Sequence, residues 1–333
     1  MATFCSTGAA LVSFKTPNGV ELNVRFDNKD NYGHERSSYI GASVGRVANR
    51  IFGAKVKVNG QDYPLPVMEQ PDITLHGGPK GYSKVQWAES SEESNGRTST
   101  VFSYTSEHLD MGFPGKVHVK AKYTPYTVTE NGVEKNVVEL EYEARLADDS
   151  PVDETVVSLT NHSYMNTSGS FDSITGTRAK VCTNKIIDLS TDGSGPTGKL
   201  VEKEGVPPNG QEFEFTDTTP AIDDCFVAQP LDQFSKLDTR GQENKELVHF
   251  WHPNTKAHLK VLSTEPVFQI YTTDRMNVPV LPGESRGYGN RCAIAVEPAR
   301  PTNAADKEEW SQWVRLRKGD VYGSRIVWES WTE

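Results

Sequence analysis

Residues 116–146 read KVHVKAKYTPYTVTENGVEKNVVELEYEARL, and this stretch decides the fold class. Apolar residues alternate with lysine and histidine over 116–123, and with glutamate and arginine over 138–145. A period of two is typical of a β-strand with one buried face. The dipeptide Asn131-Gly132 between the two segments favours a tight turn. The stretch therefore predicts an antiparallel hairpin with a lysine face beside a glutamate face.

Strand patterns continue on both sides of this hairpin. Residues 249–262 (HFWHPNTKAHLKVL) read as strand, turn and strand, and residues 321–331 (VYGSRIVWESW) alternate towards the C-terminus. Gly and Pro interrupt the chain throughout, while amphipathic helix patterns are few and no repeat of fixed period is present. The sequence predicts an all-β fold, a large antiparallel β-sandwich, made by a single domain over residues 1–333.

Composition narrows the classes of partner. Hydrophobic residues make up 35% of the chain, which suits a globular protein. The formal net charge is −10, so the electric field of the protein repels nucleic acid and anionic lipid. The N-terminus lacks the cationic start and long apolar run of a signal peptide, and no later stretch has the length of a membrane span. We expect a cytoplasmic protein with neither nucleic acid nor membrane as a partner. The four cysteines form no CxxC pair, which predicts reduced core thiols.

Common catalytic and metal-binding motifs are missing. The sequence contains no GxSxG, HExxH or GxGxxG. Residues 193–200 (GSGPTGKL) approach a phosphate-binding loop, but Leu200 stands where magnesium needs a hydroxyl, so this segment is predicted as a surface loop. The histidines 249, 252 and 258 lack an acidic or cysteine partner at useful spacing, which favours solvent-facing strand histidines over a metal site.

Five motifs place polar or ionisable side chains beside apolar runs. Each residue taken alone has an ordinary structural explanation, such as a satisfied buried histidine, a solvated glutamate or a turn-capping aspartate. Strand ends on one rim of a sandwich can nevertheless converge. The candidates are Asn49 and Arg50 in GRVANRI (45–51), His76 in LHGG (75–78), His162 in TNHSYMN (160–166), Asp223 in IDDCFV (222–227) and Glu297 in AIAVEPARP (293–301).

In this order the motifs resemble the aldose 1-epimerase family, also called galactose mutarotases. The resemblance extends over nearly the whole chain, from GASVGRVANRI (41–51) through GFPGKVHVKAKYT (112–124) and VFQIYT (267–272) to VEPARPTNA (296–304). It implies a galactose mutarotase-like supersandwich that interconverts the α and β anomers of free aldohexoses such as galactose and glucose, with no cofactor and no metal. It implies the acid at His162, the base at Glu297, and substrate-binding roles for Asn49, Arg50, His76, Asp223 and Gln269.

The chemistry of ring opening is compatible with these roles. A proton must leave the anomeric hydroxyl while another reaches the ring oxygen. Near neutral pH a glutamate such as Glu297 is ionised and a histidine such as His162 can be protonated. Arg50 and Asn49 supply hydrogen-bond donors for sugar hydroxyls, and Asp223 supplies an acceptor. The small polar neighbours of the histidine, Asn161 and Ser163, are expected to help hold it.

Some features depart from the family or leave alternatives open. Asp224 adds a carboxylate beside Asp223, and the segment 276–290 has no clear counterpart in the family motifs. A hexose-phosphate mutarotase needs a cationic site, for which Lys80 and Arg300 are the nearest candidates. A non-catalytic carbohydrate-binding sandwich does not need acid and base together. A lyase or glycosidase needs an extended groove with aromatic platforms, for which the six tryptophans are available.

Overall fold

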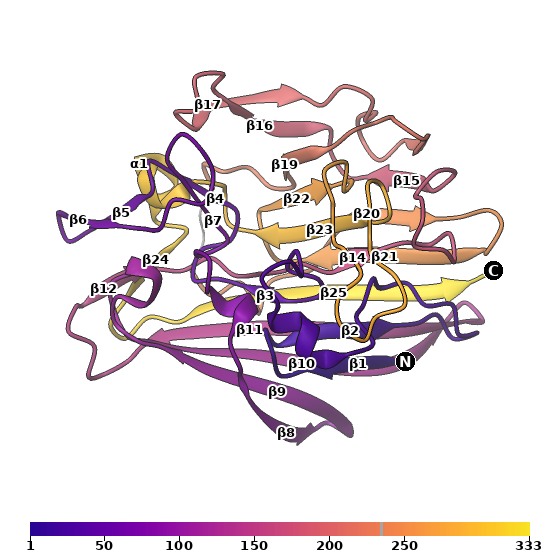
Figure 1. Cartoon of the computed structure of the whole chain (residues 1–333), viewed down its shortest axis with the longest axis horizontal. Helices are drawn as coiled ribbons and strands as arrows, with labels where there is room; N and C mark the ends of the chain where they lie inside the picture. Colours follow the sequence, from indigo (N-terminus) through magenta and orange to yellow (C-terminus); the bar gives the residue numbers. More distant parts are fainter. Residues whose placement is uncertain (234–235) are drawn as a thin grey trace.

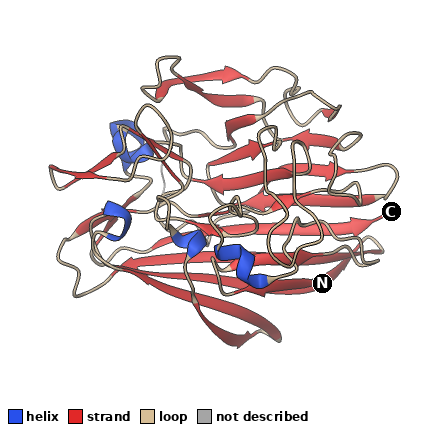
Figure 2. Ribbon diagram, in the orientation of Figure 1, coloured by secondary structure: helices blue, strands red, loops and turns tan. Residues whose placement is uncertain are grey.

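The computed structural model describes residues 1–233 and 236–333 (Figure 1). Within these residues strands dominate and helical segments are short (Figure 2), which confirms the all-β prediction. The helical segments are α1 (Glu308–Ser311) and the 3-10 turns η1 (Lys29–Gly33), η2 (Tyr82–Lys84), η3 (Asp110–Gly112) and η4 (Ala304–Asp306). Over this described part, no helix has the length and apolarity that crossing a membrane requires.

Two large sheets are built by antiparallel pairing of neighbouring strands. The nine-stranded sheet runs in the order β18-β15-β20-β21-β25-β11-β10-β9-β8, and the six-stranded sheet in the order β14-β23-β22-β19-β16-β17. In that order, the strands of the nine-stranded sheet are Glu212–Glu214, Arg178–Val181, Lys245–Trp251, Ala257–Ser263, Tyr322–Thr332, Val133–Leu146, Val117–Glu130, Arg97–Ser106 and Ala88–Ser94. Those of the six-stranded sheet, again in order, are Tyr164–Met165, Ile294–Ala299, Val267–Tyr271, Asp223–Val227, Lys185–Leu189 and Pro196–Glu202.

Short two-stranded sheets complete the described strands. They pair β1 with β2, β3 with β13, β4 with β7, β5 with β6, and β12 with β24. Their bounds are Ala2–Cys5, Ala10–Phe14, Ser43–Val44, Thr160–Asn161, Arg50–Phe52, Ile73–Leu75, Lys55–Val58, Gln61–Pro64, Glu154–Val156 and Arg315–Arg317.

The hairpin predicted from residues 116–146 is the longest pairing in the nine-stranded sheet. β10 and β11 stay in register from Val117 opposite Leu146 to Glu130 opposite Val133. Asn131 and Gly132 both have positive φ, +50° and +80°, as a two-residue turn between twisted strands requires. Lysines of β10 lie opposite glutamates of β11, so the predicted pairing of the two charged faces is confirmed.

The main core lies between the two large sheets. One continuous apolar cluster contains Leu140 and Tyr142 of the nine-stranded sheet together with Phe226, Phe268 and Val296 of the six-stranded sheet. This shared core makes the fold a β-sandwich. Successive side chains of a strand point to opposite faces, so every second residue of β19, β22 and β23 points away from this core.

Two tyrosines of the hairpin reach across the core to the strand that precedes His162. The Tyr142 hydroxyl donates to the Thr160 carbonyl oxygen at 3.0 Å. The Asn161 side-chain amide donates to the Tyr123 hydroxyl at 3.1 Å, and that hydroxyl donates to the Ala9 carbonyl oxygen at 2.8 Å. The nine-stranded sheet therefore supports β13 through buried hydrogen bonds.

Three local predictions are wrong. Residues 196–202 form the edge strand β17 because they pair with β16, which a periodicity analysis of this Gly- and Pro-containing segment does not detect. His252 and His258 are only 6% exposed rather than solvent-facing, and His258 Nδ1 lies 2.9 Å from His249 Nε2. All four cysteines are free, but Cys182 is exposed rather than in the core.

Replacing Tyr142 with Phe tests the support of β13. The variant leaves the buried Thr160 carbonyl oxygen of β13 without this hydroxyl donor, so we expect a loss of about 1–3 kcal/mol in the free energy of unfolding, measured by urea denaturation. The matched control is Tyr63→Phe, because the Tyr63 hydroxyl makes only an exposed contact; its expected effect is about 0.5 kcal/mol or less. Equal stability of the two variants contradicts the supporting role.

Candidate active site

All seven residues predicted as site residues line one cavity of about 350 Å³. They come from β4, from the turn after β7, from the break between β13 and β14, and from β19, β22 and β23. The cavity is lined by Ser38, Tyr39, Asn49, Arg50, Glu69, Leu75, His76, His162, Tyr164, Asp223, Gln269, Tyr271, Arg275, Met276 and Glu297.

Strand pairing places the polar side chains of the six-stranded sheet on one face. Gln269 lies directly opposite Glu297 on β23 and Cys225 on β19, and directly opposite residues share a face. Glu297 is in the middle of its strand, so the expectation that the site residues gather at strand ends on a rim is wrong for this residue. The site is built on the face of the sheet that points away from the main core.

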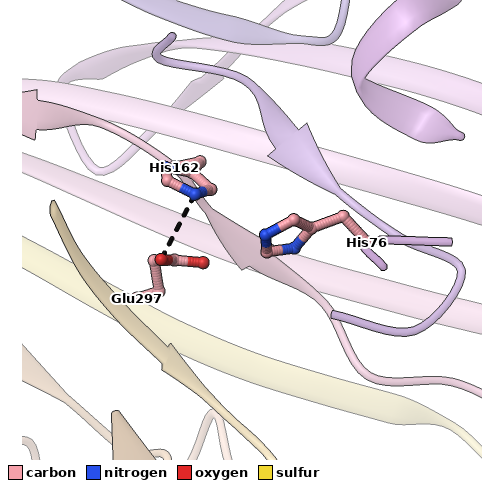
Figure 3. A group of neighbouring side chains, drawn as sticks. All are labelled: His76, His162 and Glu297. Carbon is pink, nitrogen blue, oxygen red and sulfur yellow. Dashed lines mark ion pairs between the residues drawn. The ribbon is translucent and has the colours of Figure 1, made fainter. Parts of the chain in front are cut away.

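His162 and Glu297 form a close buried pair. His162 Nε2 and Glu297 Oε1 are 3.3 Å apart, and the two residues are only 4% and 3% exposed (Figure 3). The side chains reach each other from different strands, because His162 lies between β13 and β14 and Glu297 lies on β23. Proton transfer between them and a bound molecule is within geometric reach.

Burial opposes the charged forms of both members of this pair. Desolvation raises the pKa of Glu297 to about 8, with a further rise from Asp223 and an opposing effect of Arg50. Desolvation also lowers the pKa of His162 to about 4. Both shifts act against an ionised Glu297 and a protonated His162 in the free pocket, so they favour the proton on Glu297. The pair still holds one proton, so the charged arrangement differs from this one only by a proton transfer.

His76 is a neutral donor beside the pair. Its Nδ1 accepts the backbone N–H of Asn49 at 3.3 Å, so the proton of the neutral ring is on Nε2. Burial, together with electrostatic interactions with His162 and Arg50, holds the pKa of His76 well below its ordinary value. Figure 3 shows both imidazoles and the carboxylate directed at the same space.

These three side chains also have the spacing of a metal site. One ligand atom from each of His76, His162 and Glu297 lies within 4.8 Å of the others. A neutral imidazole binds a metal through its unprotonated nitrogen, and in His76 that nitrogen already accepts a hydrogen bond from Asn49. The arrangement therefore suits hydrogen bonding to a hydroxyl better than metal binding.

A continuous hydrogen-bond network fixes the amide and carboxylate groups. The Asn49 side-chain amide donates to Gln269 Oε1 at 2.9 Å. The Gln269 amide in turn donates to Asp223 Oδ1 at 2.8 Å. Thr302, on the segment after β23, donates to Asn49 Oδ1 at 3.2 Å. These neighbours hold Asp223 as an acceptor facing the cavity.

Two arginines compensate the charge of Asp223. Asp223 Oδ2 lies 2.5 Å from Arg275 Nη2 and 3.5 Å from Arg50 Nη2. The Arg50 Nε atom also donates to Glu69 Oε2 at 2.8 Å. The Arg275 side chain is 72% exposed, whereas that of Arg50 is 19% exposed. Arg275 therefore closes this network on its solvent side.

Several lining residues escaped the sequence prediction. Tyr164 and Tyr271 stand inside the quoted motifs TNHSYMN and VFQIYT, and Tyr39 lies two residues before GASVGRVANRI. These three were detectable as neighbours of motifs. Glu69 and Arg275 lie in segments without a recognisable pattern, and only the folded chain brings them to Arg50 and Asp223.

The neighbours of His162 hold the backbone around it rather than its ring. Asn161 Oδ1 accepts the backbone N–H and the hydroxyl of Ser163, at 2.9 and 2.6 Å, and the Asn161 amide donates to the Gly41 carbonyl oxygen. Both side chains therefore stabilise the backbone around the histidine. Within the part of the chain that the structure describes, His162 Nδ1 has no hydrogen-bond partner.

The departures from the family motifs mostly lie outside the cavity. Asp224 forms an ion pair with Lys203 at 2.6 Å and does not contribute to the lining. In the segment 276–290, Met276 lines the cavity, while Val278, Leu281 and Tyr288 pack in a second apolar cluster with residues from the N-terminal part.

The cationic and aromatic candidates are not in the cavity either. Arg300 is fully buried 3.2 Å from Glu265, and Lys80 is not a lining residue. The described lining contains no tryptophan.

The raised pKa of Glu297 predicts a pH-dependent cost of burying this carboxyl group. Between pH 4.5 and about 8 the native state keeps the Glu297 proton while the unfolded chain releases it, so this contribution to stability is lost as pH rises. Glu297→Gln has no titrating carboxyl group at this position, so it removes this loss of stability at high pH. We expect the variant to exceed wild type by up to about 5 kcal/mol at pH 9, and the difference to be smallest near pH 4.5, in urea unfolding. Substitution of the exposed Glu134 by Gln controls for general charge effects. A difference that does not vary with pH contradicts the shift.

Comparison with known proteins identifies the family. A sequence model described as aldose 1-epimerase matches residues 1–329. The bifunctional protein GAL10 of Pachysolen tannophilus is 35% identical over 324 residues, which cover 96% of this chain and 44% of that protein. An uncharacterized isomerase of Saccharomyces cerevisiae, YNR071C, is 30% identical over 343 residues, covering 98% of this chain and 93% of that protein. The chain thus spans less than half the length of the GAL10 relatives it matches.

Solved structures share the fold. The GalM/aldose epimerase homologue from C. elegans has a TM-score of 0.77 at 23% identity, covering 98% of this chain and 94% of that one. Galactose 1-epimerase from Lactobacillus acidophilus has a TM-score of 0.75 at 16% identity, covering 99% and 90%. These similarities show the galactose mutarotase-like sandwich, and the match of the family model over residues 1–329 shows the family. The chain belongs to the aldose 1-epimerase family, whose members are isomerases.

Proposed function

We propose that this protein interconverts the α and β anomers of free aldohexoses such as D-galactose and D-glucose by acid–base opening and closure of the ring. The observation that carries the proposal is the His162–Glu297 pair, 3.3 Å apart in a cavity lined with hydroxyl-binding groups. The reaction needs only two proton transfers, so the proposal includes no cofactor.

Ring opening uses the charged arrangement of the pair. Glu297 takes the proton of the anomeric hydroxyl, and His162 gives a proton to the ring oxygen as the bond from the anomeric carbon to that oxygen breaks. The products are an open-chain aldehyde, a protonated Glu297 and a neutral His162. Burial favours this uncharged pair, as the two pKa shifts indicate. After rotation about the C1–C2 bond the same groups return the protons and close the ring to either anomer.

The remaining polar groups bind and orient the sugar. Arg50, Asn49 and His76 offer donors, and Asp223 offers acceptor oxygens, of which Oδ1 is held by Gln269 and Oδ2 by the two arginines. Because these groups are already fixed by hydrogen bonds to one another, little ordering is needed when a sugar binds. A prearranged site of this kind keeps the anomeric carbon beside the acid–base pair.

The size and lining of the cavity favour a single free sugar over the alternatives. A volume of about 350 Å³ is near the lower end for small-molecule sites and suits a monosaccharide. A lyase or glycosidase acting on a chain needs a longer groove with aromatic platforms, and the described lining contains no tryptophan. A binding module without activity does not require a buried acid–base pair.

The charge of the cavity disfavours a hexose phosphate. Arg50 and Arg275 are its two arginines in the described lining, and both are engaged with Asp223, Arg50 also with Glu69. A phosphate must therefore compete with carboxylates already in place. Free aldohexoses remain the proposed substrates.

Polarimetry of freshly dissolved α-D-galactose and α-D-glucose tests the proposal. Wild-type protein should speed the approach to the final rotation without changing that rotation. Glu297→Gln and His162→Asn should each lower the rate about 10² to 10⁴-fold, because each removes one proton-transfer group. Glu134→Gln, on the exposed end of β11, should behave as wild type. The absence of acceleration with both sugars would refute the assignment, and sugar phosphates are then the next substrates to test.

Arg275→Gln tests the solvent side of the binding network. Arg275 is mostly exposed, and exposed ion pairs contribute about 1 kcal/mol or less. We expect KM to rise up to about fivefold because Asp223 is less well held, with kcat within about twofold, in initial-rate polarimetry. Arg145→Gln is the matched control, since Arg145 makes an ion pair with Glu143 on the outer face of the nine-stranded sheet. A large fall in kcat with unchanged KM is incompatible with a role in binding.

A further inference from the structure

The orientation of the His162 ring depends on contacts other than hydrogen bonds to Nδ1. A catalytic imidazole is commonly held by a carboxylate or carbonyl at the nitrogen that does not react. In the described structure His162 Nδ1 has no such partner, although the residue is buried. Two tyrosine rings contact the imidazole instead. The Tyr39 ring is stacked on it at 5.7 Å with an angle of 19°, and the Tyr164 ring lies 4.7 Å away.

Tyr39 contacts both histidines of the cavity. Its ring centroid is 4.7 Å from that of His76, and the His76 and His162 rings are 5.1 Å apart. The three rings therefore form one cluster in which Tyr39 is the residue without an acid–base function. Displacement of the Tyr39 ring would leave a space into which the His162 ring can turn.

The backbone around Tyr39 is held in an unfavourable conformation. Ser38 and Tyr39 have φ of +49° and +62°, in the left-handed region that a bulky residue rarely adopts. Such a conformation persists only where the surroundings impose it, and it is common at functional sites. Here the Ser38 carbonyl accepts the Tyr164 hydroxyl at 3.0 Å, and the Tyr39 carbonyl accepts the Ala42 N–H at 2.9 Å.

Lys84 fixes the same loop from its outer side. Its ammonium donates to the His34 carbonyl oxygen at 2.7 Å and to the Ser37 hydroxyl, and it lies 5.5 Å from the centre of the Tyr39 ring. These contacts hold the segment 34–42 on both sides of Tyr39. The Tyr39 ring therefore stays stacked on the His162 imidazole.

We propose that Tyr39 is a positioning residue for the ring-opening reaction: its ring keeps His162 Nε2 directed at Glu297 and stabilises the imidazolium that forms when His162 holds the proton. This inference rests on the proposed function. An aromatic face attracts a cation, and the attraction is stronger where water is excluded. Burial alone opposes the imidazolium, so a stacked ring offsets part of that cost.

The other groups that face His162 do not replace Tyr39. The His162 backbone and the Asp223 carboxylate favour its protonation, Glu297 lies 3.3 Å from its Nε2, and His76 is neutral next to it. Tyr164 supplies a second ring from β14. The pKa of Lys84 is lowered to about 8 by burial, so its own titration affects the alkaline side of a pH profile. The acid limb of the pH profile therefore reports on the protonation of His162.

Tyr39→Leu and Tyr39→Phe separate the ring from the hydroxyl. We expect Tyr39→Leu to lower kcat about 5- to 30-fold with KM within about threefold, and to move the acid limb of the kcat profile to lower pH by up to about 1 unit. Tyr39→Phe, which keeps the ring, should stay within about twofold of wild type. Tyr63→Leu, on the hairpin β5–β6, controls for loss of a tyrosine elsewhere.

The contrary results are equally definite. The inference is overturned if Tyr39→Leu keeps the wild-type kcat or raises KM alone. It is also overturned if the acid limb moves to higher pH, because removal of a ring that merely excludes water should make His162 easier to protonate. If Tyr39→Leu does not fold by circular dichroism, Tyr39→Met takes its place.

A titration of the His162 imidazole followed by NMR keeps this test independent of the proposed function. The protonation of His162 should be weaker in Tyr39→Leu than in wild type and unchanged in Tyr39→Phe, whether or not any sugar is converted. If the titrations show this pattern but the wild type does not speed mutarotation, the proposed function is refuted. The effect of the Tyr39 ring on the protonation of His162 is then still supported.

Discussion

The site depends on the pairing of β22 with β19 and β23 in the six-stranded sheet. This pairing places Cys225, Gln269 and Glu297 in one row, and it turns Phe226, Phe268 and Val296 into the main core on the opposite face. A slip of one residue would exchange the two faces, burying polar groups in the core and exposing aromatic rings. The burial of apolar side chains in the core therefore sets the position of Glu297.

The nine-stranded sheet has a supporting part in the same arrangement. Its long hairpin supplies Tyr123 and Tyr142, whose hydroxyls bind the segment that leads into His162. The histidine is thereby placed opposite Glu297 by a sheet that contributes no residue to the cavity. Buried hydrogen bonds of this kind are directional, so they determine position more strictly than apolar packing alone.

Burial of the acid–base pair has a chemical consequence. Removing water disfavours the charged arrangement and favours the uncharged pair with the proton on Glu297. That state is the one left after ring opening in the proposed reaction. Arg50 lowers the cost of ionising Glu297, while Asp223 raises it, so the network proposed to bind the sugar also affects the proton balance of the pair.

The sequence by itself determined the class of fold, the hairpin and most of the polar residues that share the cavity. Period-two alternation records which face of a strand is buried, so strands such as β10, β11 and β25 could be predicted from local pattern. The ordered motifs carried the family resemblance and, with it, the seven residues that line the cavity. Only the tertiary structure decided where Glu69 and Arg275 lie, because their contacts join segments far apart in the chain. It also decided the protonation of His162 and Glu297, since a pKa shift caused by burial depends on the surrounding atoms and not on neighbours in sequence.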